Sequence, residues 1–201
     1  MYVKPQSFFL LLLLLLGVGA VPGFAEDAAV VPLAIAWKAK LIHPLPAAAS
    51  METCHPDAGI SPEATAAVAL NVDDAEWPSH QLPGPWESYG GEWATADGEA
   101  VFRVTIDLPA ALADHDLELS LGAIDDFDTT FVNGEAVGHV DKSVLGYWAL
   151  QRVYPVPARL AKAGKLLIAV RVFDHFGGGG FTGPKEQMLL RLATPPTAPA
   201  K

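Results

Sequence analysis

Three aspartates crowd into four positions of the segment GAIDDFDTTFVNGEAVG, which covers residues 122–138. In an extended chain Asp126 and Asp128 project from one face, whereas Asp125 and Phe127 project from the other. Two carboxylates on one face could contribute to a calcium site, because Ca²⁺ takes about six to eight oxygen ligands. They are not part of an Asp-rich calcium-binding loop of about twelve residues, and no bidentate Glu follows them. Asp126 and Asp128 are therefore weak candidates for a structural calcium site, and no other cofactor is expected.

Two other roles are open to the same acids. A pair of carboxylates can hydrolyse a glycosidic bond, but the acids must then flank the bound sugar at a separation of about 5 Å or more. Acids on one short strand rarely do so. The alternative that we favour is structural: the carboxylates accept hydrogen bonds from turn amides and from a buried arginine, for which Arg152 and Arg171 are the candidates.

A hairpin follows the acids. Asn133 and Gly134 separate two β-like runs, and this pair tolerates positive φ angles at both central positions of a tight turn. Gly138 lets the second run bend or bulge. We therefore interpret the whole segment, with one arginine partner, as a structural motif. Its members are Asp125, Asp126, Asp128, Asn133, Gly134 and Arg171.

The elements around this motif are short β-like runs divided by turns rich in Pro, Gly and Asp, from Trp77 onward. In the run VFRVTIDL, residues 101–108, larger apolar residues alternate with mostly polar ones, as in an antiparallel strand with one buried face. Residues 61–70 indicate a short helix, with Ser61 as the N-cap and Pro62 in the first turn. Many short strands with little helix between them predict an all-β fold, an antiparallel β-sandwich.

The first 25 residues carry Lys4, the apolar run FFLLLLLLLG and small residues before Glu26. This pattern predicts a secretory signal peptide, with an uncleaved anchor helix as the alternative, and hence an exported protein, periplasmic or extracellular. Removing the segment takes away one positive charge and changes the formal net charge from −10 to −11. Such a balance argues against nucleic acid or anionic lipid as partners. No second apolar run of membrane length follows, so we expect the mature chain to lie outside the membrane.

Composition divides the chain into four regions. We expect a signal peptide at 1–25, an N-terminal arm with a short helix at 26–75, the β-sandwich domain at 76–193 and a Pro-rich tail at 194–201. The lone cysteine, Cys54, cannot form an intramolecular disulfide, so a hydrophobic core must supply the stability.

Four stretches resemble, in order, one known module. They are WPSHQLPGPWESYGG (77–91), VFRVTIDLP (101–109), LGAIDDFDTTFVNGEAVG (121–138) and RVYPVPARLAKAGKLLIAVRVFDHFGGGGFTGP (152–184). Together they resemble the galactose-binding-like jelly-roll domain of sialate O-acetylesterases and family 2 glycoside hydrolases. The resemblance implies a jelly-roll sandwich, but one fold hosts many functions.

The catalytic motifs of those enzymes are missing. The esterases would need a Gly-Asp-Ser block and a later Asp-x-x-His, and the glycosidases an Asn-Glu pair; this sequence contains none of these strings. Asn71 and Asn133 are followed by Val and Gly. We therefore expect a domain without catalysis of its own.

A sugar ring offers one apolar face and a rim of hydroxyls, so its binding site combines aromatic platforms with polar side chains. We expect the site at one end of the sandwich, on the loops Tyr147–Arg152 and Gly177–Gly183. Trp77 and Trp86, set among prolines, are expected to plug the end of the sandwich instead. The candidate ligand-binding residues are Trp93, Tyr147, Trp148, Arg152, Asp174, His175 and Phe181.

The sequence thus predicts a secreted, non-catalytic carbohydrate-binding module whose partner is a carbohydrate or a glycan surface. The alternative is an accessory or extracytoplasmic interaction or sensor domain. Such a domain would pack on a hydrolase or signalling partner and have no sugar site of its own.

Overall fold

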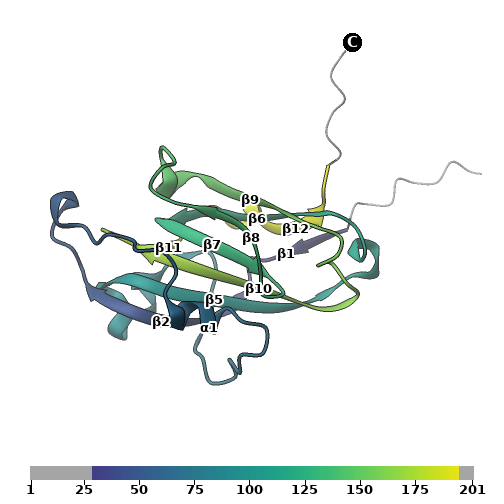
Figure 1. Ribbon diagram of the computed structural model, residues 1–201, viewed down its shortest axis with the longest axis horizontal. Coiled ribbons are helices and arrows are strands. Elements are labelled where there is room, and N and C mark those ends of the chain that lie inside the picture. The colour runs from purple at the N-terminus through teal and green to yellow at the C-terminus, as the bar shows by residue number, and fades with distance from the viewer. Residues whose placement is uncertain (1–28, 195–201) are drawn as a thin grey trace, which may run out of the picture.

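Two antiparallel β-sheets stack face to face in the computed structural model, which describes residues 29–194 (Figure 1). The first sheet contains, in spatial order, β1 (Val30–Pro32), β12 (Met188–Leu192), β6 (Leu117–Asp125), β11 (Gly180–Phe181) and β4 (Gly84–Pro85), and β9 (Gln151–Val156) pairs with β6. The second contains β3 (Ser79–Gln81), β2 (Ala36–Pro46), β5 (Ala96–Leu108), β10 (Gly164–Asp174), β7 (Phe127–Val132) and β8 (Glu135–Val140). The all-β sandwich expected from the sequence is confirmed.

Helical structure is confined to short pieces. The described residues contain one α-helix, α1 (Pro62–Ala67). The remaining helical turns are of the 3₁₀ type: η1 (Met51–Thr53), η2 (Trp86–Tyr89), η3 (Gly91–Thr95), η4 (Ala110–Leu112), η5 (Tyr147–Ala149) and η6 (Lys185–Gln187).

The expected N-cap of α1 is confirmed, because the Ser61 hydroxyl accepts a hydrogen bond from the Ala64 N–H at 3.0 Å. The helix lies on the outer face of the second sheet, where Ala64 and Ala67 pack with Val101 of β5 and Ala169 of β10. This cover explains why β5 is buried on both faces along much of its length, although its sequence alternates as a half-exposed strand does.

The main core fills the space between the two sheets. Its largest fully buried side chains include Trp37 of β2, Trp86 of η2, Phe102 of β5 and Phe181 of β11. Phe102 and Phe181 meet edge to face, with their ring centroids 5.2 Å apart. Trp86 is thus buried at the position expected from its proline-rich surroundings, whereas Trp77 lies half-buried on the outer face of the second sheet.

The expected boundary between an N-terminal arm and the sandwich is wrong for the first part of the arm. β1 pairs with β12, and β2 lies between β3 and β5 in the second sheet. The physical reason is a period of two in β2, which buries Trp37, Ala39 and Leu41 in the core while Lys38 and Lys40 face outward. Residues 30–46 therefore belong to the sandwich.

The Asn-Gly hairpin is confirmed. Asn133 and Gly134 join β7 to β8 with φ angles of 50° and 81°. The register between the two strands shifts after Thr130, next to Gly138. A Cβ atom at Gly138 would lie 2.0 Å from the ring of Tyr154 in β9, so only glycine lets the edges of the two sheets approach here.

The signal peptide expected at 1–25 and all but the first residue of the expected tail lie outside the described residues. Between residues 29 and 194, no helix has the length and apolar character needed to cross a bilayer.

Candidate functional site

Asp128 is the acceptor at the centre of a buried polar network. Its carboxylate accepts hydrogen bonds from Arg152 Nε at 2.9 Å, from the Tyr154 hydroxyl at 2.9 and 3.0 Å, and from the Thr130 hydroxyl at 2.9 Å. The side chains of Arg152 and Asp128 are both completely buried. These contacts fit the structural role favoured for Asp128, because both of its oxygens accept hydrogen bonds from neighbouring side chains.

Arg152 also fixes the loop that precedes β9. Its guanidinium donates to the carbonyl of Leu150 at 2.7 Å, to that of Asp126 at 2.7 Å, and to that of Tyr147. A buried guanidinium with this many acceptors cannot reach a ligand. Arg152 was expected to bind the ligand; it instead positions the loop that carries Tyr147 and Trp148.

Asp126 anchors a second loop. Its carboxylate accepts a hydrogen bond from the His175 N–H at 3.0 Å, which ties the end of β10 to the start of β7. Within the described part of the chain, no group of three or more His, Cys, Asp or Glu side chains is placed to hold a metal ion. Arg171, the other expected partner of these acids, pairs instead with Glu99 at 2.7 Å and with Asp57 at 2.7 and 2.8 Å.

These anchors surround a hollow at one end of the sandwich, with a volume of about 270 Å³. Trp148 and Tyr147 meet edge to face, with centroids 5.0 Å apart and an interplanar angle of 84°. The Tyr147 hydroxyl lies 3.0 Å from Nε2 of His175. Trp148 is 50% exposed, so one large aromatic surface faces solvent beside several polar groups. The lining residues are Met51, Asp125, Asp126, Tyr147, Trp148, His175 and Phe176.

Two acids at the hollow, Asp125 and Asp174, have pKa values well above the ordinary value. Burial, and then the neighbouring Asp126 carboxylate, raise the pKa of Asp125 to about 8. Burial, and then the charges of Asp97 and Asp126, raise the pKa of Asp174 to about 9. One carboxyl oxygen of Asp174 has no hydrogen-bond partner among the described residues, which fits a group that is uncharged at neutral pH. Asp125 lines the hollow as a carboxylic acid, able both to donate and to accept hydrogen bonds.

Three of the expected ligand-binding residues, Tyr147, Trp148 and His175, line the hollow. Trp93 and Phe181 do not: Trp93 is 6% exposed and packs edge to face against Trp86, and Phe181 is 0% exposed between Trp37 and Phe102. Asp174 is likewise fully buried and contributes only from behind. The prediction that these three residues contact the ligand is therefore wrong. Trp93 and Phe181 belong to the hydrophobic core between the sheets, and Asp174 is buried at the end of β10.

The glycine-rich loop has a different role from the one expected. A Cβ atom at Gly179 would lie 2.3 Å from the indole of Trp86, and one at Gly183 would lie 2.4 Å from the Ala123 nitrogen. The Gly179 N–H also donates to Glu87 at 2.9 Å. The glycines therefore let the backbone pack against Trp86 and β6, and the loop contributes no lining residue between 177 and 183.

Two lining residues were missed by the sequence analysis. Met51 comes from η1 in the segment interpreted as an arm, and Phe176 follows His175 immediately. The segment that carries Met51 is held by a hydrogen bond from the His55 N–H to the His175 carbonyl at 2.9 Å and by the Arg171–Asp57 ion pair. No local motif signals these long-range contacts. Phe176, by contrast, could have been inferred from its position beside a candidate.

No protein-family model matches the sequence, and no curated protein matches it. Solved structures do match in fold. A family 2 glycosyl hydrolase from Bacteroides cellulosilyticus superposes with a TM-score of 0.57 at 18% identity, over 81% of this chain and 20% of that chain. Bacteroides uniformis β-glucuronidase 2 gives a TM-score of 0.57 at 18% identity, over 82% and 18%. A family 2 β-galacturonidase from Eisenbergiella tayi gives 0.54 at 13% identity, over 83% and 25%.

The chain therefore has the fold of a β-sandwich domain found within family 2 glycoside hydrolases, and it spans about a fifth of the length of those enzymes. At these identities the likeness shows the fold alone. The resemblance to family 2 glycoside hydrolases is confirmed at that level, whereas the resemblance to sialate O-acetylesterases stays a prediction.

Proposed function

We propose that this protein is a non-catalytic carbohydrate-binding module whose ligand occupies the hollow beside Trp148. The observation that carries the proposal is the pairing of a half-exposed indole with polar groups in one concave site. A pyranose can lie with its apolar face on such an indole, while its hydroxyls bond to Asp125, His175 and Tyr147. The protein acts by binding alone in this proposal.

The rigidity of the site supports the proposal. Arg152 holds the turn through the carbonyls of Tyr147 and Leu150 and joins it to the carbonyl of Asp126, whose carboxylate in turn holds the His175 backbone. A preformed site loses less entropy when it binds. Because the site is small and open, we expect weak binding, with a dissociation constant in the millimolar range.

A glycan array probed with the purified protein and with the Trp148→Ala variant tests the proposal. We expect the native protein to retain a defined set of glycans and the variant to lose them. Leu145→Ala is the matched control, because Leu145 is 98% exposed near the same turn but does not line the hollow. Retention of the same glycans by Trp148→Ala, or of none by the native protein at millimolar concentration, would contradict this function.

A second function is favoured by a specific observation. Apolar side chains are exposed around the same end of the molecule, and contiguous apolar surface marks interaction sites. Leu145 is 98% exposed, Leu150 41% and Met51 53%. The alternative is that this end packs on a glycoside hydrolase or signalling partner. Under this alternative the native protein retains no glycan, and Leu145→Ala weakens binding to the partner.

A further inference from the structure

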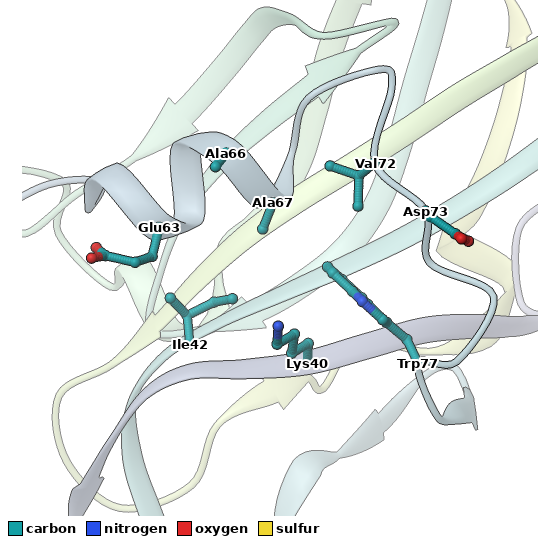
Figure 2. Close-up of a pocket in the computed structure, with 8 residues that line it drawn as sticks. All are labelled: Lys40, Ile42, Glu63, Ala66, Ala67, Val72, Asp73 and Trp77. Carbon is teal, nitrogen blue, oxygen red and sulfur yellow. The ribbon is translucent and has the colours of Figure 1, made fainter.

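A second concave site lies on the outer face of the second sheet, beneath α1 (Figure 2). It has a volume of about 370 Å³ and shares no residue with the hollow beside Trp148. Three elements form it: β2, α1 and the segment that returns from α1 to β3. The lining residues are Lys40, Ile42, Glu63, Ala66, Ala67, Val72, Asp73 and Trp77.

The floor of this groove is apolar. The Trp77 side chain reaches across it from the returning segment toward α1, and Ile42 and Val72 lie at its sides (Figure 2). The two alanines of α1 that line the groove, Ala66 and Ala67, have short side chains and so narrow it little on the helix side. Ile42 sits where the register between β2 and β5 shifts, so a bulge turns it toward the groove.

Charged groups of both signs form the rim. Lys40 Nζ lies 5.6 Å from the centroid of the Trp77 ring. Glu63 is held by His43, with 3.2 Å between Nε2 and the carboxylate oxygen. Asp73 lies on the opposite side of the groove from Glu63 (Figure 2). The rim therefore offers donors and acceptors around a flat aromatic surface, with two carboxylates against one ammonium group.

The returning segment is fixed at both ends, so the groove is part of the fold. The buried Arg103 donates from Nη1 to the carbonyls of Ala67 and Ala69, both at 2.9 Å, and from Nε to Asp74 at 2.7 Å. At the other end, Lys38 donates to the carbonyls of residues 75 and 77, both at 2.9 Å. These bonds hold the Trp77 backbone in place, and the Arg103 guanidinium also lies over the indole, 5.9 Å from the ring centroid.

We infer that this groove is a second carbohydrate site, specific for a neutral pyranose stacked on Trp77. An aromatic platform with a mixed polar rim matches a ring that has one apolar face and hydroxyls at its edge. The surplus of carboxylates repels an acidic sugar, and the charged rim disfavours a purely apolar ligand. The inference stands on the groove alone and does not depend on the site beside Trp148.

Two separate sites would change how the protein binds a polymer. Each site is expected to be weak, but a glycan that spans both converts the second contact into an intramolecular one. The protein would then bind a polysaccharide more tightly than the matching monosaccharide. A substitution that blocks either site would remove this difference in affinity.

The test is a titration of the ¹⁵N-labelled protein with glucose, galactose, mannose and glucuronate, followed through the indole N–H resonances of Trp77 and Trp148. We expect at least one neutral hexose to shift the Trp77 resonance and glucuronate to leave it in place. Ala66→Leu fills the groove from the exposed side of α1 and should abolish that shift. Thr65→Leu adds the same side chain at an exposed neighbour that does not line the groove, and it should keep the shift.

The outcomes separate the two sites. If Trp148→Ala leaves the Trp77 shift intact while Ala66→Leu removes it, the groove binds sugar independently. A Trp77 resonance that no neutral hexose moves, that moves equally in Ala66→Leu, or that responds only to glucuronate would overturn the inference. If no sugar shifts the Trp148 resonance while the Trp77 resonance responds, the result contradicts the proposed function of the hollow beside Trp148 and leaves the inference about the groove standing.

Discussion

At the scale of single residues, one buried ion pair shapes the candidate site. Arg152 forms an ion pair with Asp128, and its other N–H groups donate hydrogen bonds to three backbone carbonyls. The turn that presents Tyr147 and Trp148 is therefore set by a side chain that no ligand touches. A buried charge that loses its partner is costly, because the low-polarity interior solvates it poorly.

We predict that Asp128→Asn destabilises the protein by about 3–5 kcal/mol, since it leaves the Arg152 guanidinium buried without a counter-charge. The midpoint of urea unfolding measures the effect. Asp107→Asn is the control, because Asp107 pairs with Lys165 on the exposed surface and such pairs contribute little. Equal stability losses in the two variants would contradict the role assigned to the buried pair.

A second residue-scale prediction concerns pH. The pKa values of Asp125 and Asp174 are raised to about 8 and about 9 in the folded protein, above the ordinary value of 3.8. At a pH above 3.8 and below the raised pKa values, the folded state keeps protons that the unfolded state has released. The free energy of unfolding therefore falls as pH rises. We expect the unfolding midpoint to decrease from about pH 5 toward about pH 9.

Asp174→Asn should flatten this dependence, because the amide is uncharged at every pH and resembles the protonated acid. The measurement is a series of thermal unfolding curves across the same pH range. If the variant keeps the slope of the native protein, Asp174 does not contribute to the pH dependence.

At the scale of elements, the glycine-rich loop between β10 and β11 is a packing device. Gly179 allows its backbone to lie against Trp86, whereas Gly178 has free space around it. From the sequence, four consecutive glycines suggest a ligand or a neighbour equally well. The partner is an indole more than ninety positions away in the chain, which no local pattern identifies.

We predict that Gly179→Ala destabilises the protein by about 1–3 kcal/mol, because the added methyl group overpacks the contact with Trp86. Gly178→Ala should be nearly neutral: its Cβ would lie 3.9 Å from the nearest heavy atom, and its φ angle does not require glycine. Thermal unfolding of the two neighbouring variants gives a matched comparison. The packing role is refuted if both lower the melting temperature alike.

The elements predicted best were those with local signals. The hairpin at Asn133-Gly134 and the N-cap at Ser61 depend on residues close together in the chain, and both are present in the structure. The site was predicted only in part. Tyr147, Trp148 and His175 line the hollow, but burial of Trp93 and Phe181 depends on which strands become neighbours, and that depends on contacts between distant residues.

At the scale of the whole molecule, the sandwich begins at β1, earlier in the chain than the start at residue 76 predicted from the composition. β2 supplies Trp37 to the core and separates β3 from β5, so the second sheet is incomplete without it. The segment was interpreted as an arm because Ala, Pro and Val dominate residues 26–60, although one strand-like patch was recognised around Ile35 to Ile42.

We predict that a chain beginning at residue 76 fails to fold, because it lacks β1, β2 and the cover provided by α1. A chain beginning at residue 29 should fold. Amide proton dispersion in NMR spectra distinguishes the two outcomes. A folded product from the shorter chain would show that residues 29–75 are an accessory to the sandwich.

The five tryptophans divide sharply by their surroundings. Trp37, Trp86 and Trp93 are buried in the core, while Trp148 and Trp77 retain contact with solvent. Intrinsic fluorescence therefore separates into a shielded population and an accessible one, and acrylamide should quench only the latter. Since the accessible indoles are those of the two proposed sugar sites, protection from quenching would report occupancy without any label.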